Sequence, residues 1–406
     1  MKKLIYSFLF AFIATVPTIA QEQKNILDKM KEEVSFLASD ELEGRQTGTA
    51  AERIAAEYIR DKFKKYNLIA KGEDNYFQYF EAKIKKSPHS QEIKKNIKGT
   101  NVIGYINNNK EETIIIGAHY DHLGYGDFGS LYDGEKEIHN GADDNASGVS
   151  ILINLARGLQ EIKDYNYLFI AFSGEEHGLF GSSYYAKNPT INLEKVRFMI
   201  NFDMVGRLNQ DYTLAINGVG TSDKWKDLIN EANTFNLTLK TTESGIGPSD
   251  HTSFYLQNIP AVHFFTGQHE DYHKPTDDVE QINFEGMYII YEYVKNIIIQ
   301  SIKIENFSFQ ETVSDTTTTP KFKVTLGVMP DYLFDGKGMR IDGISKGKTA
   351  EKFGILKGDI VVKMGDIIVN DMMNYMQALS KFNKGDSTRV QVYRDKEIIE
   401  LDIVFQ

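Results

Sequence analysis

Apolar runs alternate with helical patterns between residues 25 and 302. Four runs are rich in β-branched and aromatic side chains and apolar at successive positions: 113–118, 167–172, 196–202 and 259–265. That pattern predicts strands buried on both faces. Amphipathic spacing predicts helices over 25–38, 49–66, 146–160, 225–235 and 284–302. Strands alternating with helices predict an α/β sandwich with a largely parallel central sheet.

The sequence pattern of residues 1–20 predicts a signal peptide and not a segment of the folded domain. Lys2 and Lys3 precede an apolar run over 4–16, and Ala20 supplies a small residue for cleavage. A membrane anchor is the alternative, but a run of that length, at about 1.5 Å per residue, falls short of the ~30 Å hydrocarbon core. The sequence therefore predicts an exported protein, periplasmic or secreted, with no transmembrane anchor after cleavage.

A threonine-rich stretch divides the rest of the chain. Residues 310–320 read QETVSDTTTTP, which is typical of a linker, although an extended edge strand is the alternative. We therefore expect a first domain over 21–306, a linker over 307–320 and a small, β-rich second domain over 321–406.

Charge and cysteine content narrow the possible functions. The chain carries a net charge of −11, whereas residues 321–406 hold 14 basic and 12 acidic side chains, so the acidity belongs to the first domain. An acidic surface disfavours nucleic acid as a partner. The chain has no cysteine, so its stability must come from a large core, and thiolate metal ligands are excluded.

Polar side chains of metal-ligand types cluster where the predicted strands end. They are His119 and Asp121, then Glu175 and Glu176, then Asp203, with Asp144 before a predicted helix and His273 in a late loop. Ligands of open α/β sheets bind at the carboxyl ends of the strands. Taken singly, each motif has an ordinary structural explanation, such as a helix cap or a first helical turn. Together they favour a metal site.

The motifs HYDH, GADDNASG, SGEE, NFD and YHKPTDD occur in an order that resembles the M28 family of zinc aminopeptidases. The resemblance covers about residues 37–302 and includes LASDELEGRQTGT. It implies two zinc ions, one held by His119 and Asp203, the other by Glu176 and His273, with Asp144 bridging both. It also implies Glu175 as the general base, Asp121 as the residue that orients His119, and a cis peptide bond after Asp144.

The residue types agree with such a centre. Imidazole and carboxylate are the expected zinc ligands where no thiolate exists. Glu175 and Glu176 are adjacent and cannot point the same way, so one is expected to bind metal and the other to move protons. His251 is a candidate substrate-pocket residue because the resemblance extends to Ser249-Asp250-His251. The remaining histidines are assigned surface or supporting roles (His122, His139, His177) or no function (His89, His263, His269).

The second domain has its own motif. LKGDIVVKMGD, at residues 356–366, resembles the PDZ domain of bacterial proteases. The resemblance implies that Leu326, Gly327 and Val328 present backbone N–H groups to the C-terminal carboxylate of a peptide, which adds a strand to the sheet. The alternative is a spacing module that binds nothing.

These features predict an exported di-zinc metallopeptidase, most simply an aminopeptidase that removes N-terminal residues from oligopeptides. Carboxypeptidase action and glutaminyl cyclisation with a single zinc are alternatives on the same fold. A non-enzymatic peptide-binding protein is a further alternative, against which the complete ligand set and Glu175 argue.

Overall fold

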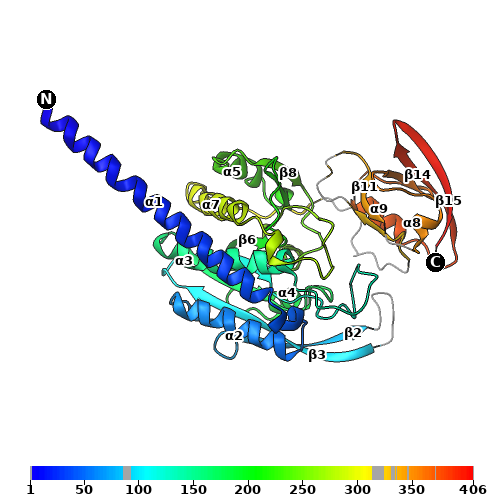
Figure 1. Ribbon diagram of the computed structural model, residues 1–406, viewed down its shortest axis with the longest axis horizontal. Helices are drawn as coiled ribbons and strands as arrows, with labels where there is room; N and C mark the ends of the chain where they lie inside the picture. The colour runs from blue at the N-terminus through cyan, green and yellow to red at the C-terminus, as the bar shows by residue number, and fades with distance from the viewer. Residues whose placement is uncertain are drawn as a thin grey trace.

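The computed structural model describes residues 2–85, 93–312, 324–330, 334, 336–344, 347–370 and 372–405. Within them the chain forms a larger and a smaller unit, each with its own sheet and its own hydrophobic core (Figure 1). The linker predicted at 307–320 falls largely on residues 313–320, which lie outside the described residues.

The larger unit is built on a mixed sheet whose centre is parallel. Its strands are β1 (Ile69–Ala70), β2 (Phe77–Lys85), β3 (Ile93–Ile106), β4 (Thr113–His119), β5 (Asn166–Phe172), β6 (Val196–Phe202), β7 (Thr213–Asn217), β8 (Thr238–Thr242) and β9 (Ala261–Phe265). Their order is β1-β3-β5-β4-β6-β9-β7-β8, with β2 paired to β3. Strands β5, β4, β6 and β9 run parallel, while β3 and β7 run antiparallel to their inner neighbours. The four predicted strands form this centre.

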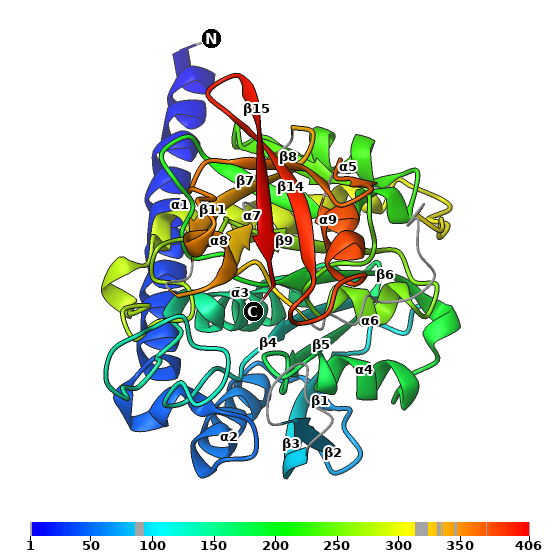
Figure 2. The same ribbon diagram turned by 90° about the vertical axis from the view of Figure 1, so that its right-hand side faces the viewer.

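Helices cover both faces of this sheet. They are α1 (Lys2–Leu37), α2 (Ala50–Lys65), α3 (Gly148–Gly158), α4 (Phe180–Lys187), α5 (Trp225–Ala232), α6 (His251–Tyr255) and α7 (Phe284–Ser301). Ile114 and Ile116 of β4 pack into the core beneath α1, α3 and α7, whereas Ile115 faces the opposite core with Phe254 of α6. Figure 2 shows the sheet running from β1–β3 at one edge of the molecule to β7 and β8 at the other. The α/β sandwich predicted from the sequence is therefore confirmed.

Helix α1 begins at Lys2, well before the predicted helix over 25–38, and extends away from the body of the molecule in Figure 1. Its C-terminal half packs through Ile26, Met30, Val34 and Leu37. Among the residues described, no helix combines the length and apolarity that crossing a bilayer requires. The signal peptide stays a prediction.

The smaller unit is an antiparallel sheet with two short helices. Its strands are β10 (Val328–Pro330), β11 (Met339–Ile344), β12 (Ile360–Met364), β13 (Ile367–Ile368), β14 (Ser387–Arg394) and β15 (Glu397–Val404), and its helices are α8 (Thr349–Lys352) and α9 (Met372–Leu379). All its strand pairs are antiparallel. Leu326, Ile341, Val361 and Val390 lie in a core that belongs to this unit alone. A small β-rich domain was expected here.

The segment after α7 still belongs to the larger unit. The Phe307 ring lies 4.7 Å from that of Trp225 and 4.9 Å from that of Phe198. The backbone N–H of Thr312 donates to the Tyr255 hydroxyl (3.1 Å). Residues assigned to the linker from the sequence thus pack on the larger unit as far as Thr312.

Candidate metal centre

The predicted metal ligands meet at the carboxyl edge of the parallel strands. His119 is the last residue of β4, Asp203 follows β6 directly, and Glu176 lies in the loop after β5. Asp144 lies in η2 (Ala142–Ser147), a π-helical turn at the start of α3, and His273 lies in the loop after β9. Parallel neighbours end at the same edge, so residues far apart in the sequence converge there.

Asp144 lies between two imidazoles. Its Oδ1 is 3.3 Å from Nε2 of His119, and its Oδ2 is 3.3 Å from Nε2 of His273. The side chain is almost completely buried. The peptide bond between Asp144 and Asn145 is cis, as the resemblance implies. Each carboxylate oxygen therefore faces a different histidine.

Two groups of potential ligands share Asp144. In the first, Nε2 of His119 lies 3.3 Å from Oδ1 of Asp203, and the ligand atoms of His119, Asp144 and Asp203 all lie within 4.8 Å of one another. In the second, the ligand atoms of His122, Asp144 and Glu176 lie within 4.8 Å of one another, and Nε2 of His273 lies 3.2 Å from Oε2 of Glu176. All five predicted ligands thus lie together around Asp144.

His122 is the histidine of the second group, a position that the sequence did not predict for it. Its Nδ1 lies 2.7 Å from Oε1 of Glu176 and 3.9 Å from Oδ2 of Asp144. Nδ1 of His273 donates to the Gly129 carbonyl (2.8 Å), an assignment that leaves the Nε2 lone pair facing the carboxylates. The short His122–Glu176 contact is instead an ordinary hydrogen bond. The geometry favours His273 as the ligand and His122, which is buried, as the support of Glu176.

Charge pairing keeps two carboxylates of the cluster ionised in spite of their burial. Burial opposes ionisation of Asp144, but hydrogen bonds from His119 and His273 hold its pKa well below the ordinary value. Burial likewise opposes charge on Glu176, yet His273 and His122 lower its pKa to about 2. Burial alone would lower the pKa of His119, but Asp203 and its other carboxylate neighbours raise it well above the usual range. Buried carboxylates that hold imidazoles in this way are a donor set that fits zinc.

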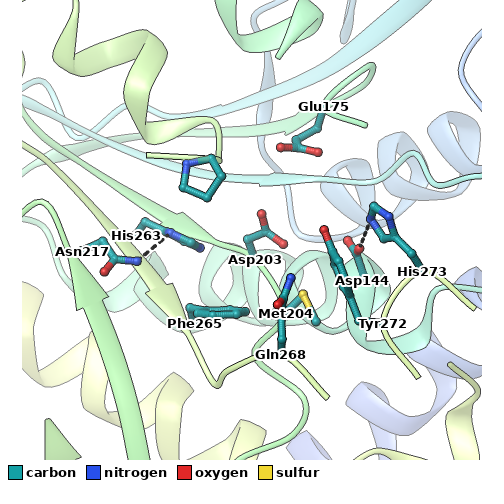
Figure 3. A pocket seen from close by; sticks show the side chains of 11 residues that line it. Asp144, Glu175, Asp203, Met204, Asn217, His263, Phe265, Gln268, Tyr272 and His273 are labelled. Carbon is teal, nitrogen blue, oxygen red and sulfur yellow. Dashed lines mark hydrogen bonds and ion pairs between the residues drawn. The ribbon is translucent and has the colours of Figure 1, made fainter. Parts of the chain in front are cut away.

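Glu175 faces the same cavity without joining either ligand group found among the described residues. Figure 3 shows its carboxylate across from Asp203 and apart from the Asp144–His273 pair. Its backbone N–H donates to Oδ1 of Asp121 (3.2 Å). Burial raises the pKa of Glu175 well above its ordinary value, and the nearby charges of Asp203 and Glu176 add to this against the attraction of His119.

Asp121 connects His119 to Glu175. Its Oδ1 lies 3.7 Å from Nδ1 of His119, while Nδ1 has a shorter contact, 3.2 Å, with the Asp121 main-chain carbonyl. Oδ2 accepts a hydrogen bond from the Thr47 hydroxyl (2.9 Å). The aspartate therefore fixes the imidazole mainly through its own backbone, and its carboxylate fixes the main chain at Glu175. The sequence predicted the first contact and not the second.

Two buried aspartates that the sequence did not single out hold the Asp144 loop. Asp277 accepts hydrogen bonds from the backbone N–H groups of Asp143 and Asp144, both at 3.0 Å to Oδ2. Asp143 accepts from the Gly206 N–H (2.6 Å), and its Oδ2 contacts Nε2 of His269 (3.1 Å). Asp277 belongs to the motif that contains His273, so one short segment supplies a candidate ligand and a support for Asp144.

Arg45 is buried behind the same loop. Its guanidinium donates to the main-chain carbonyls of Tyr120 and Leu37 (2.7 Å each), Gly141 (2.8 Å) and Asp144 (3.4 Å), with a further short contact to the Asn140 carbonyl. Burial lowers the pKa of Arg45 to about 10, so it remains charged at neutral pH. This clamp, the Arg45 guanidinium with its five carbonyl partners, ties the N-terminal segment to the loop that carries Asp144.

The turn before Arg45 brings the side chain into place. Gly44 has φ 67°, and a β-carbon there would lie 2.4 Å from the His139 carbonyl oxygen. Only glycine fits this close approach in a left-handed conformation.

Arg45→Lys is expected to destabilise the protein by about 3 kcal/mol, because a lysine cannot reach all the buried carbonyls and an unpaired buried polar group costs about 1–3 kcal/mol. Chemical denaturation of the metal-free protein measures the change. Arg53→Lys, at an exposed position of α2, is the matched control and should leave the stability within about 0.5 kcal/mol of the parent. Equal midpoints for the two variants would contradict the role of the clamp.

The other candidate histidines occupy different places. His251 does not line the cavity; its ring stacks on that of His263, 5.0 Å away, and His263 lines the cavity. His139 is buried, with Nε2 2.8 Å from the Ser130 hydroxyl. His89 lies outside the described residues. The sequence therefore offered His251 as the candidate pocket residue, whereas the neighbouring His263, to which it assigned no function, lines the cavity.

The residues predicted to bind a peptide in the second domain lie at the entry to β10. Leu326 is buried, and its carbonyl accepts from the Ala350 N–H (2.7 Å). Gly327 has φ 72°, and its N–H donates to the Thr325 hydroxyl (2.9 Å). Val328 starts β10, which pairs with β11.

Comparison with known proteins agrees with this arrangement. Residues 101–298 match the model of peptidase family M28, and residues 315–404 match the model of the PDZ domain. The chain therefore contains a peptidase M28 domain followed by a PDZ domain.

Individual relatives are consistent with that assignment. Aminopeptidase YwaD of Bacillus subtilis (strain 168) is 28% identical over 241 residues, which are 56% of this chain and 49% of the relative. The chain spans about half the length of the first curated relatives it matches. The fold is similar to that of BSAP, a zinc aminopeptidase from Bacillus subtilis (TM-score 0.57, 19% identity, 69% of this chain and 96% of the other). It is also similar to a Bacteroides thetaiotaomicron glutaminyl cyclase (TM-score 0.55, 19% identity, 67% and 97%).

Proposed function

We propose that the chain is an aminopeptidase that uses two zinc ions to remove N-terminal residues from peptides. The observation that carries the proposal is the position of Asp144, whose two oxygens face His119 and His273 separately. In this proposal His119 and Asp203 would hold one ion, His273 and Glu176 would hold the other, and Asp144 would contact both. The aminopeptidases among the relatives support the choice of reaction.

The chemistry that a zinc pair supplies is Lewis acidity toward a carbonyl oxygen and an acidified water. The residues of the chain do the rest. Glu175 lines the cavity beside the ligand groups, where its carboxylate is available to take a proton from water and return it to the leaving amine. Asp121 holds both the His119 side of the centre and the backbone of Glu175, so base and ligand keep a fixed relation.

A substrate panel tests this function. The zinc-loaded full-length protein is given amino-acid amides, tripeptides with a free N-terminus and the same tripeptides with an acetylated N-terminus, and bound zinc is measured in parallel. We expect release of the first residue from free peptides only. Cleavage of the acetylated peptides from the C-terminus would identify a carboxypeptidase instead.

Glutaminyl cyclisation is the second candidate, because the fold is also similar to that of a glutaminyl cyclase. It releases ammonia from an N-terminal glutamine and leaves the peptide bond intact, so mass spectrometry separates it from hydrolysis. Two complete ligand groups around Asp144 favour a pair of ions over a single one.

We also propose that the protein is exported. The support for this is the order of Lys2 and Lys3, the apolar run that follows and the small residue Ala20. Fractionation of cells that express the full chain, with N-terminal sequencing of the product, tests it.

The PDZ domain is proposed to bind the C-termini of longer substrates without taking part in the chemistry. Every proposed metal ligand lies before residue 274, and the two units have separate cores. Truncation after Thr316 keeps the Phe307–Thr312 segment that packs on the peptidase domain. It should leave kcat/KM for an amino-acid amide within about twofold while raising KM for long peptides about tenfold, because tethering raises local concentration.

A full-length variant provides the control for this truncation. Gly327→Val should reproduce the loss on long peptides, because a β-carbon at Gly327 would lie 2.2 Å from Cβ of Lys348 and distort the turn. Equal losses on amides and long peptides in the truncated protein would show that the domain supports the catalytic fold instead.

A further inference from the structure

The cavity at the metal centre continues into a polar pocket. It has a volume of about 70 Å³ and reaches from Asp144 and His273, past Asp203, to Asn217 and His263. Figure 3 shows Asn217 and His263 on the opposite side of Asp203 from the proposed bridging residue. A water needs roughly 10–15 Å³ of such space, so the cavity has room for about five groups of that size. The far end of the pocket, formed by Asn217 and His263, has room for a small side chain of a substrate residue next to the bond that is cut.

The far end of the pocket is formed by a hydrogen-bonded pair on neighbouring strands. Asn217 ends β7 and lies directly opposite His263 of β9. The Thr242 hydroxyl donates to Oδ1 of Asn217 (2.8 Å), so the amide nitrogen of Asn217 faces Nδ1 of His263 (3.3 Å). An imidazole whose Nδ1 accepts this bond carries its hydrogen on Nε2 and is neutral. The amide is held in one orientation by its two partners.

Buried polar atoms of this pocket lack partners among the described residues. Oε1 of Gln268, on the cavity wall, has no hydrogen-bond partner. Nε2 of His263 also has none of regular geometry, although the His263 ring interacts with the Asp203 main chain. The pocket thus offers both an acceptor and a donor, and none of the side chains at its far end is charged. An aliphatic side chain would leave these atoms unpaired, at about 1–3 kcal/mol each.

Phe265 and Tyr272 complete the wall with flat apolar surfaces. A carboxylate entering the pocket would approach Asp203 and Glu175 and could not donate to Gln268. A carboxamide carries a donor and an acceptor on one planar group without charge, so it offers a partner of the right kind to each unpaired atom.

We propose that the pocket selects a carboxamide side chain, so that the first residue of a preferred substrate is asparagine or glutamine. The inference rests on the proposed aminopeptidase function, since it takes the pocket beside the metal centre as the site of the first side chain.

The test compares side chains matched in shape. Tripeptides X-Ala-Ala with X as asparagine or leucine, and with X as glutamine or glutamate, are given to the zinc-loaded full-length protein, and released X is measured by mass spectrometry. We expect kcat/KM to be at least about tenfold higher for each amide than for its partner, which corresponds to one hydrogen bond of about 1.4 kcal/mol. A leucine peptide cleaved faster than the asparagine peptide would overturn the inference.

Two variants locate the preference in the pocket. Gln268→Leu removes the unpaired acceptor, and Asn217→Leu removes the hydrogen bond that fixes the tautomer of His263, both at nearly constant volume. Each should lower the asparagine-to-leucine ratio of kcat/KM about tenfold. Asn230→Leu makes the same change on an exposed turn of α5 and should leave the ratio unchanged. An unchanged ratio in every pocket variant that folds would overturn the inference.

The same experiment separates the inference from the function on which it rests. Loss of ammonia from the glutamine peptide with its peptide bond intact would overturn the aminopeptidase proposal and still support carboxamide recognition. Absence of any reaction with all four peptides would overturn both. Rapid release of every X at similar rates would support the aminopeptidase and overturn the pocket preference.

Discussion

Glu175→Gln should lower kcat by about 10²–10⁴-fold while the protein still binds two zinc ions. The amide cannot accept a proton from water or return one to the leaving amine, yet it keeps nearly the shape of the carboxylate. The backbone N–H of residue 175 still donates to Asp121 in the variant, so the loop after β5 stays anchored. Steady-state kinetics on a tripeptide and zinc analysis of the purified variant measure the two quantities.

The adjacent residue provides the comparison. Glu176→Gln should lose zinc as well as activity, because Glu176 contacts His273 and His122 within the second ligand group. If Glu175→Gln emptied one zinc site while Glu176→Gln kept both, the roles of the two glutamates would be exchanged.

Asp144→Asn should weaken both zinc sites together and abolish measurable hydrolysis. A carboxamide has one oxygen and one N–H₂ group, so it cannot offer a lone pair to each of two cations, and it carries no charge to offset them. His273→Ala, in contrast, should empty mainly one site, because His273 contacts only the second ligand group through Glu176 and Asp144. Zinc titration followed by calorimetry distinguishes the two patterns.

His122→Ala is the control for this experiment. If His122 supports Glu176 and does not bind metal, the variant should keep two zinc ions with weaker affinity, in the range of 10–100-fold for loss of such a support. One zinc ion per chain in Asp144→Asn would exclude the bridging role. One zinc ion in His122→Ala with two in His273→Ala would assign the ligand role to His122.

The sequence predicted the centre of the fold because buried parallel strands and long amphipathic helices have strong patterns. The strands β4, β5 and β6 are almost fully buried on both faces, and their apolar runs are continuous. The outer strands were missed for the opposite reason. β2 and β3 form an edge ladder with lysines and other polar residues along it, and the helices α4 and α6 have only 8 and 5 residues. Such segments carry too little periodicity to recognise.

The candidate ligands could be recognised in the sequence, whereas the residues that hold them in place could not. Ligand side chains must be imidazole or carboxylate, so their types are visible in the sequence. Asp277, in contrast, reaches Asp143 across 134 positions, and Arg45 reaches Gly141 across 96. Only the folded chain brings such partners together. His263 could not be recognised for the same reason. It is a single histidine within an apolar strand, and only the fold places it opposite Asn217 on the neighbouring strand.

The Arg45 clamp gives the centre a counter-ion that stays in place when metal leaves. Its guanidinium is attracted to Asp144, Asp121 and Asp277, and it is tied to main-chain oxygens rather than to the ligands themselves. When metal is scarce, the carboxylates left behind still face one permanent positive charge, and the loop that carries Asp144 keeps its anchor. The metal-free protein should therefore stay folded, with the site nearly preformed. The rate of zinc binding should then be limited by the arrival of the ion and not by refolding of the site.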